Sequence, residues 1–196
     1  MTSKGQLKMN EHLSAYYDAL ASRPIFHTQR FILQTPAEKD IPALIDIVGD
    51  WEVASRLARI PHPYTEEHAR FFLDEVVPGE LVWSIIDRAS GIMAGAVGLA
   101  PYAQEAGTIE LGYYLGRRHW GKGIATEAGS VVVAYGAGLV GQHRLRSGYF
   151  ADNSASGRVL EKLGFVKLGT SERDCLTTGE TNPSIEMTYS PVWAGS

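Results

Sequence analysis

Cysteine is nearly absent from this sequence of 196 residues, in which Cys175 is the single thiol. One cysteine cannot form a disulfide within the chain, and a reducing, cytoplasmic environment is therefore the expected setting. The six histidines include no pair spaced to place two metal ligands on one helix face, and a single thiol cannot build a zinc site. We therefore expect chemistry that uses no metal.

Long apolar runs and an excess of positive charge are absent as well. No stretch approaches the roughly 20 apolar residues that a membrane-spanning helix needs. The N-terminus lacks the basic flank and apolar stretch of a secretion signal. The net charge of −4 argues against a general nucleic-acid binder, because such proteins need a basic surface to displace counterions. We expect a soluble monomer or homodimer with neither membrane nor nucleic acid as a partner.

The remaining composition favours one folded domain. The chain is long enough to bury a real core, and 44% of its residues are hydrophobic against 20% charged. We expect a single domain over residues 25–192. Residues 1–24 are expected to form an N-terminal extension whose first eight residues are disordered. A short helix within residues 10–22 would carry Leu13, Tyr16, Tyr17 and Leu20 on one face.

Hydrophobic periodicity predicts the elements of this domain. A capping box at Thr35–Glu38 starts a helix that is interrupted or restarted at Pro42, with Asp40 as a possible second cap, and that ends near Gly49. Thr65 starts another helix. A long helix is expected from about Lys122 to Leu139, and a short one after Asn153. The order strand–helix–strand around the long helix predicts a right-handed parallel crossover. The fold class is α+β with a mixed, mostly antiparallel sheet; its seven expected strands are 30–35, 80–87, 91–100, 107–116, 144–150, 165–171 and 184–190, the last two joined by a long loop.

Residues 119–128, HWGKGIATEA, place two glycines around a lysine where a strand meets the long helix. The stretch from Gly116 nearly matches the phosphate loop of nucleoside triphosphatases, but Gly123 stands where the magnesium-binding hydroxyl belongs. It nearly matches a dinucleotide turn too, but Thr126 replaces the third small residue. Both matches are weak. A glycine-rich turn that enters a helix nevertheless exposes unpaired N–H groups, and these bind phosphate.

The whole context of this turn resembles the GNAT acetyltransferase superfamily. The resemblance rests on the preceding strand, the following helix and strand, and the later segments NSAS and EKLGF, and it extends over roughly residues 27–190. The stretch ELGYYLGRRHWGKGIATEA is similar to the ribosomal-protein N-terminal alanine and serine acetyltransferases. The superfamily motif, Gln/Arg-x-x-Gly-x-Gly/Ala, falls on Trp120–Ala125, with Trp120 in place of Gln or Arg. The resemblance implies a GNAT fold with helices on both faces of the sheet, and acetyl-CoA as co-substrate.

The resemblance also implies where acetyl-CoA binds. Residues 121–126 would cradle the pyrophosphate, the strand before them would lie along the pantetheine arm, and Asn153 would bond to that arm. Gly112 would form a bulge that opens a slot for the thioester. Each basic residue near the phosphates could equally be solvated surface. The full expected set is Tyr113, Tyr114, Leu115, Arg117, Arg118, Gly121, Lys122, Gly123, Ile124, Ala125, Thr126, Asn153, Arg158 and Lys162.

Two residues are candidates for the chemistry of acetyl transfer. Glu110 lies in the central strand, where this superfamily often places a base that acts through water; alternatively, it is a strand carboxylate paired with an arginine. Leu160 occupies the position of the usual tyrosine acid. Ser156 is the expected replacement, and its alternative role is a helix hydroxyl that contacts CoA.

The acceptor pocket is expected to form from residues 51–65 and 171–183. Trp51, Tyr64 and Glu110 would line it, and the acids Glu172, Asp174 and Glu180 would attract an amine. At pH 7 about a tenth of an α-amine of pKa near 8 is neutral, against less than about 0.1% of a lysine. One weak base therefore suits an α-amine, such as a protein N-terminus. A small-molecule acceptor (polyamine, amino acid or aminoglycoside) and a non-catalytic acyl-CoA sensor remain open.

Overall fold

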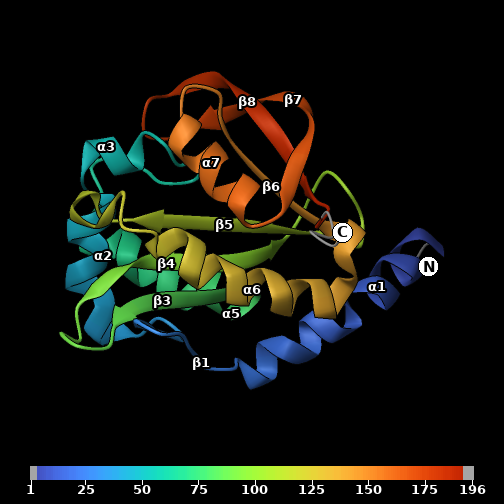
Figure 1. The fold of residues 1–196 in the computed structure, drawn as a ribbon, viewed down its shortest axis with the longest axis horizontal. Helices are drawn as coiled ribbons and strands as arrows, with labels where there is room; N and C mark the ends of the chain where they lie inside the picture. Colours follow the sequence, from blue (N-terminus) through green and yellow to red (C-terminus); the bar gives the residue numbers. More distant parts are fainter. Residues whose placement is uncertain (1–3, 192–196) are drawn as a thin grey trace, which may run out of the picture.

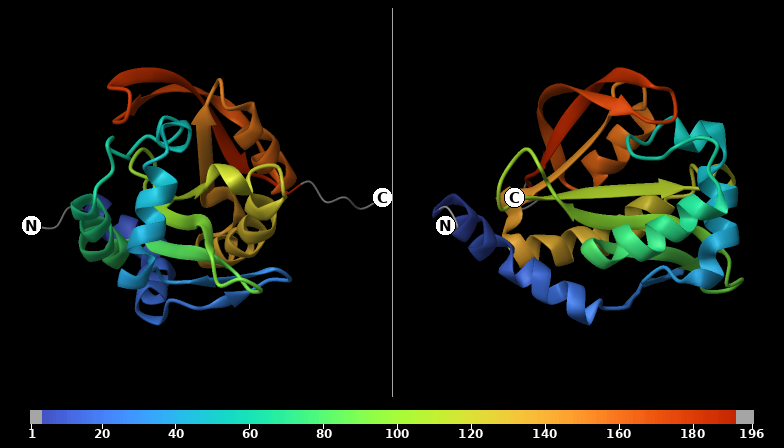
Figure 2. Two further views of the ribbon diagram at one scale, coloured as in Figure 1. Left: turned by 90° about the vertical axis from the view of Figure 1, so that its left-hand side faces the viewer. Right: turned by 180° about the vertical axis from the view of Figure 1, so that it is seen from behind.

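The computed structural model describes residues 4–191, with side-chain burial from residue 13 onward. Its centre is one mixed sheet with the strand order β1-β2-β3-β4-β5-β6-β8-β7. Helices cover both faces of this sheet (Figure 1, Figure 2). Neighbouring strands are antiparallel except for β5 and β6, which are parallel. The α+β class, the helices on both faces and the single parallel crossover are thereby confirmed. No helix among residues 4–191 is long and apolar enough to cross a membrane.

The elements have the following bounds. The strands are β1 (Phe26–His27), β2 (Phe31–Gln34), β3 (Leu81–Asp87), β4 (Met93–Pro101), β5 (Ile109–Leu115), β6 (Leu145–Phe150), β7 (Phe165–Cys175) and β8 (Glu180–Tyr189). The α-helices are α1 (Lys4–Ser22), α2 (Ile41–Val48), α3 (Trp51–Ala54), α4 (Glu66–Phe71), α5 (Val77–Gly79), α6 (Ile124–Val140) and α7 (Ser154–Lys162). All seven predicted strands are present. The described sheet has an eighth, because the two residues of β1, too few to show a periodicity, pair with β2.

The predicted capping box at Thr35 is wrong. The chain first makes a 3-10 turn at Glu38–Asp40, and α2 begins only at Ile41. The carboxylate of Asp40 accepts hydrogen bonds from the Ala37 N–H and the Ser84 hydroxyl, both at 3.1 Å. Asp40 is buried, so its bond to β3 satisfies a polar group that would otherwise be costly. This tertiary contact determines where the helix begins.

The N-terminal helix is part of the main core. Helix α1 is longer than predicted, and Leu13, Tyr16 and Ala19 are buried among core residues contributed by the sheet and α6. The Tyr16 hydroxyl donates to the Leu99 carbonyl of β4 at 2.9 Å. The first eight residues were expected to be disordered, but residues 4–8 belong to this helix. Residues 1–3 lie outside the described residues, as does the predicted domain end at 192.

The sheet has a hydrophobic cluster on each face. One lies under α1, α6 and α7, and the other lies under α2, α3 and α4. Figure 2 (left) shows α6 and α7 on one side of the sheet and α2 and α4 on the other. Because strand side chains alternate between faces, Leu111 and Tyr113 face α6, whereas Tyr114 packs in the second cluster with α2. Glu110 and Gly112 share the face of Tyr114. The predicted base, Glu110, and the side chain of Tyr113 therefore lie on opposite faces of the sheet.

The last hairpin differs from the prediction. Strands β7 and β8 run on to Cys175 and back from Glu180, so a short turn replaces the expected long loop. Residues 171–175 pair one by one with residues 180–184. These ladder hydrogen bonds outweigh the low strand propensity of the acidic and small polar residues in this stretch.

Candidate functional site

The central feature of the candidate site is a parting of β5 and β6. The two strands pair only at Ile109–Leu145 and Glu110–Arg146. Beyond these pairs β6 turns away from β5, carrying α7, β7 and β8 with it (Figure 1). The Ser147 hydroxyl bonds the Leu111 carbonyl at 2.9 Å, close to the point where the strands diverge. The last residues of β5 therefore face a gap and not a neighbouring strand.

The backbone groups that face this gap follow from the β4–β5 ladder. The Tyr102 N–H donates to the Thr108 carbonyl and the Gly116 N–H to the Ala94 carbonyl, both at 2.9 Å. Even-numbered residues of β5 therefore direct their backbone groups toward β4, and odd-numbered residues direct theirs away. The N–H groups of Tyr113 and Leu115 consequently point into the gap. An extended ligand can pair with them as an added strand would.

The glycine-rich turn lies at the end of β5, next to the gap. Gly121 and Gly123 have φ angles of 71° and 72°, the left-handed region that favours glycine. Helix α6 begins at once with Ile124, and no side chain caps its first N–H groups. Ile124 and Ala125 are buried, so only their backbone can contact a ligand. The turn thus has the two left-handed glycines and the uncapped helix start from which the sequence predicts phosphate binding.

Trp120, which departs from the family motif, ties this turn to β5. Its indole N–H donates to the Leu115 carbonyl at 2.8 Å. Arg56 lies over its ring at 5.8 Å. The substituted residue therefore holds the turn against the strand that precedes it.

Positive charge gathers around the turn. Burial lowers the pKa of His119, and the nearby charges of Arg118 and Lys122 lower it further. Arg117 and Arg118, however, form ion pairs with Asp50 at 3.1 Å and Asp46 at 3.3 Å. Both arginine side chains are more than half exposed, so these pairs are weak enough to rearrange. Arg158 and Lys162 are exposed on α7.

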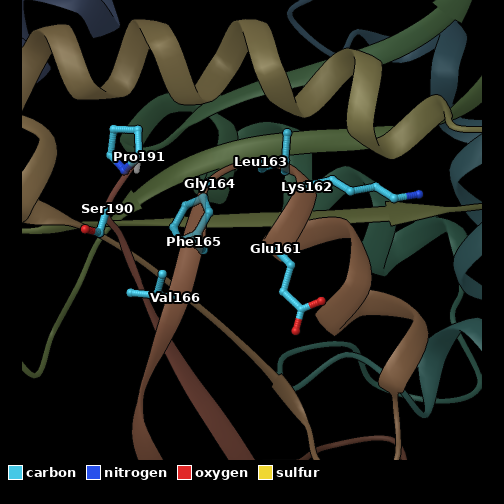
Figure 3. Close-up of a pocket in the computed structure, with 8 residues that line it drawn as sticks. All are labelled: Glu161, Lys162, Leu163, Gly164, Phe165, Val166, Ser190 and Pro191. Atoms are coloured by element: carbon cyan, nitrogen blue, oxygen red, sulfur yellow. The ribbon is translucent and has the colours of Figure 1, made fainter. Parts of the chain in front are cut away.

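A surface hollow of about 350 Å³ lies at the far end of α7 and is lined by residues 161–166, Ser190 and Pro191 (Figure 3). Lys162 is the one predicted site residue in it, and its side chain points away from Ser190 and Pro191 (Figure 3). The residues that line the hollow include neither a proposed catalytic group nor any residue of the glycine turn. We assign it no function.

On the α6 side of the gap, β5 meets the start of α7. The Tyr113 hydroxyl shares a 2.7 Å hydrogen bond with the Ser156 hydroxyl and donates to the Ser156 carbonyl at 3.2 Å. Burial raises the pKa of Tyr113 to about 12, although the bond to Ser156 partly offsets this rise. The Asn153 side-chain oxygen accepts from the Ser156 N–H at 3.3 Å and so caps the helix. Three predicted site residues thus form one cluster.

On the opposite face, Glu110 is paired with an arginine. Its carboxylate contacts the Arg173 guanidinium of β7 at 2.7 Å. Arg173 also bonds both oxygens of Glu186 on β8, at 3.0 and 2.7 Å, and Glu186 further accepts from Tyr102 and Ser171. The guanidinium lies against Gly148, where an added Cβ would meet it at 2.7 Å. The arginine pairing named as an alternative for Glu110 is therefore present, and the two carboxylates leave this cluster with a net charge of −1.

The two segments predicted to form the acceptor pocket lie against each other. The Leu176 N–H donates to the Ala58 carbonyl at 3.0 Å, and the Thr177 hydroxyl donates to the Ile60 carbonyl at 2.8 Å. Buried Cys175 contacts the carbonyls of the same loop. The tip of the β7–β8 hairpin is therefore fixed to residues 55–60. Glu172, Asp174 and Glu180 lie exposed on this hairpin.

Individual pocket residues differ in how accessible they are. Trp51 is 49% exposed on α3, stacked edge-on against His62. Tyr64 is only 8% exposed and packs in the second hydrophobic cluster near Tyr114. Burial raises the pKa of both tyrosines, to about 12 for Tyr64. Gly112 is exposed on the same face, and an added Cβ there would meet nothing within 4 Å. Open space on this face therefore lies over Gly112, between Glu110 and Tyr114.

Sequence reasoning did not identify Arg173 and Glu186 as partners of Glu110. The three residues lie on three different strands, so no spacing in the sequence connects them. No group of three His, Cys, Asp or Glu side chains able to hold a metal ion occurs among residues 4–191.

Comparison with known proteins agrees with this geometry. A family model described as an acetyltransferase (GNAT) domain matches residues 30–166. The chain is 31% identical over 151 residues to the uncharacterised N-acetyltransferase YoaA of Bacillus subtilis (strain 168), covering 74% of this chain and 85% of the relative. It is also 34% identical over 70 residues to the ribosomal protein uS5-alanine N-acetyltransferase of Escherichia coli (strain K12), covering 36% of each protein.

Solved structures share the fold. A GNAT-family acetyltransferase from Bacillus anthracis has a TM-score of 0.72 at 22% identity, covering 84% of this chain and 96% of that one. The spermidine N-acetyltransferase from Vibrio cholerae, solved with CoA and spermine, has a TM-score of 0.69 at 16% identity, covering 83% and 97%. At these identities the likeness shows the fold alone. The family match over most of the chain, together with the parted strands and the glycine turn, establishes that this protein belongs to the GNAT N-acetyltransferases, a family that uses acetyl-CoA.

Proposed function

We propose that this protein transfers the acetyl group of acetyl-CoA directly to a primary amine, with a protein or peptide N-terminal α-amine as the acceptor. The observation that carries the proposal is the parting of β5 from β6 beside the glycine turn. The gap offers strand-like N–H groups to the pantetheine arm, and the turn offers helix N–H groups to the pyrophosphate. The side-chain NH₂ of Asn153 lies on the other wall and would donate to a pantetheine carbonyl.

The chemistry requires a neutral amine, a polarised thioester and a proton for the departing thiolate. The amine nitrogen attacks the acetyl carbon, the carbon–sulfur bond breaks, and the nitrogen loses a proton. We assign the uptake of that proton to Glu110 through water. The Tyr113 N–H is suited to stabilise the oxyanion, because it points into the gap.

Ser156 is the proposed proton donor to sulfur. It shares its proton with the Tyr113 hydroxyl, so the two groups would deliver one proton together. A tyrosine therefore does reach this position, but it comes from β5 and not from the helix that usually supplies it. The balance is complete when the thiol leaves, Glu110 returns its proton to solvent, and the Ser156–Tyr113 pair takes one proton back from solvent.

The acceptor side favours a cationic amine. The Glu110–Arg173–Glu186 cluster keeps one excess negative charge beside the open space over Gly112. A base already neutralised by an arginine suits an α-amine, which is partly neutral at pH 7. The resemblance to the uS5-alanine acetyltransferase points in the same direction. A polyamine acceptor is the second candidate, because the spermidine acetyltransferase shares this fold.

An amine panel tests this proposal. Purified protein and acetyl-CoA are mixed with peptides that begin with alanine or serine, with the same peptides blocked at the N-terminus, and with spermidine, and released thiol is followed. We expect thiol release with free N-termini and none with blocked ones. Thiol release with spermidine alone would show that the acceptor is a polyamine and not a protein N-terminus. Acetyl-CoA that neither binds nor reacts with any amine would overturn the enzyme proposal.

A further inference from the structure

A partly buried carboxylate, 19% exposed, links the start of α6 to the β1–β2 turn. Glu127, in the first turn of α6, accepts from the Thr28 hydroxyl at 2.7 Å and from the Arg30 N–H at 2.8 Å. Its second oxygen contacts the Arg30 Nε at 2.6 Å. Burial raises the pKa of Glu127, but the bonds from Thr28 and Arg30 outweigh this effect and lower the pKa overall. Glu127 therefore holds Arg30 in one orientation.

Arg30 carries this link into the glycine turn. Its Nη1 donates to the Lys122 carbonyl at 3.0 Å. Its Nη2 lies 3.8 Å from the point that a Cβ on Gly123 would occupy. One guanidinium thus contacts both the helix start, through Glu127, and the peptide between the two left-handed glycines.

The contact with the Lys122 carbonyl has a geometric consequence. In a planar trans peptide the C=O and the following N–H point in opposite directions. A carbonyl of Lys122 that is held toward Arg30 therefore directs the Gly123 N–H away from Arg30, to the open side of the turn. Glycine-flanked peptides rotate at little cost, so an unheld carbonyl could swing into the phosphate site and repel the anion.

We propose that Arg30 and Glu127 are positioning residues for the phosphate-binding turn: their ion pair fixes the Lys122–Gly123 peptide so that the Gly123 N–H faces the pyrophosphate of CoA. This inference rests on the proposed function, since it assumes that CoA binds at this turn. It adds a segment almost a hundred residues distant to the co-substrate site. Arg30 acts here through its orientation of the turn, so a lysine, which lacks the planar fork, cannot replace it fully.

Calorimetric titration of the intact protein with CoA and with pantetheine, which lacks the phosphates, tests the proposal. Arg30→Met should raise the Kd for CoA about tenfold and leave the Kd for pantetheine unchanged. Arg30→Lys should lie between wild type and Arg30→Met. Arg70→Met is the matched control: Arg70 also bridges two carboxylates, Glu38 and Glu66, but lies on α4. Its CoA affinity should equal that of wild type.

A spectroscopic readout separates positioning from a structural tether. In wild type, CoA should shift the amide resonance of Gly123, and in Arg30→Met that shift should shrink. If Arg30→Met unfolds, Glu127→Gln, which keeps the size and one acceptor, serves as the second variant. Wild-type CoA affinity in either variant, with lowered stability alone, would overturn the inference and leave a tether. Failure of wild type to bind CoA would instead overturn the proposed function.

Discussion

At the scale of single residues, the role of Glu110 depends on where the fold places its side chain. It lies on the second residue of β5, on the face away from α6, and its oxygen contacts Arg173 at 2.7 Å. The ion pair compensates the charge of the carboxylate and fixes it beside the open space over Gly112. The contact with Arg173 therefore positions the group that we propose as the base.

We predict that Glu110→Gln lowers turnover about 10²-fold at pH 7, near the low end for general-base catalysis, and leaves the Kd for acetyl-CoA nearly unchanged. Raising the pH toward 9 supplies neutral amine from solution and should restore the variant relative to wild type. The measurement is the rate of thiol release with the best amine of the panel. Glu105→Gln, another carboxylate in an arginine pair, is the control and should keep wild-type turnover.

Equal turnover of wild type and Glu110→Gln at pH 7 would remove Glu110 from the mechanism. Lower stability without rescue at high pH would assign it the structural role alone. Both outcomes are separable from a binding defect, since the acetyl-CoA affinity is measured on the same variant.

At the scale of the elements, the glycine turn and the β7–β8 hairpin shape the two ends of the site. The turn needs left-handed backbone at Gly121 and Gly123; an added Cβ would meet nothing within 4 Å at Gly121 and Arg30 Nη2 at 3.8 Å at Gly123. The hairpin brings Arg173 and Glu186 across the gap to Glu110. The glycine turn is predicted by a local sequence motif, whereas the contact of the hairpin with Glu110 depends on the pairing of distant strands.

We predict that Gly123→Val lowers CoA affinity at least about tenfold while the fold survives. The valine is strained at positive φ, by roughly 1–2 kcal/mol, and its branched side chain stands where the backbone must approach a phosphate. Gly179→Val is the matched control, because Gly179 has nearly the same φ, 70°, and an added Cβ there would meet nothing within 4 Å in the β7–β8 turn. Calorimetric titration with CoA should find normal affinity in the control; equal affinities in both variants would place the phosphates elsewhere.

The pH dependence of stability provides a test of the hairpin. Burial tends to raise the pKa of Glu186, but the bonds from Arg173 and Ser171 prevail and lower it below its ordinary value of 4.5. A carboxyl whose pKa is lower in the folded state stabilises the fold above its unfolded pKa, and this stabilisation is lost as the pH falls through the folded pKa.

We therefore predict that Glu186→Gln flattens the loss of stability on acidification from about pH 6 to pH 3. Urea unfolding at several pH values measures it. Glu52→Gln, at an exposed carboxylate on α3, should keep the wild-type slope. A Glu186→Gln slope equal to that of wild type would show that the Arg173–Glu186 contact contributes nothing measurable.

At the scale of the whole molecule, α1 closes the core beneath β3 and β4. The Tyr16 hydroxyl donates to the Leu99 carbonyl at 2.9 Å and accepts from the Leu81 N–H at 3.4 Å. Burial raises the pKa of Tyr16 well above its ordinary value. One side chain thus joins the N-terminal helix to two strands of the central sheet.

We predict that Tyr16→Phe lowers the free energy of unfolding by about 1–3 kcal/mol, because it leaves two buried backbone groups without their partner. Tyr17→Phe is the control: Tyr17 is 46% exposed, and its change should stay within about 0.5 kcal/mol. Urea denaturation of the full chain measures both. A Tyr16→Phe variant as stable as wild type would reduce α1 to a loosely attached extension.

The sequence by itself determined the local features of this protein, namely its longer strands, its long helix and its glycine-rich turn. Alternating and helical periodicities identified the seven longer strands and the long helix, and HWGKGIATEA predicted a phosphate-binding turn, because these features depend only on neighbouring residues. It also supplied the family and the cluster of Asn153 and Ser156 at a helix start. Local spacing failed at Thr35 and at residues 171–183, where a contact of Asp40 with Ser84 and a strand ladder override intrinsic preference.

Only the tertiary structure decided which distant groups meet. The point at which β5 and β6 part depends on their three-dimensional arrangement. Three contacts join separate elements: Glu110 with Arg173, Tyr113 with Ser156, and Arg30 with Lys122. Such contacts depend on strand register and on the face of the sheet to which a side chain points. A shift of one residue in register would move every side chain of a strand to the other face, and the strands that bring Glu110 and Arg173 together carry residues 63 positions apart in the sequence.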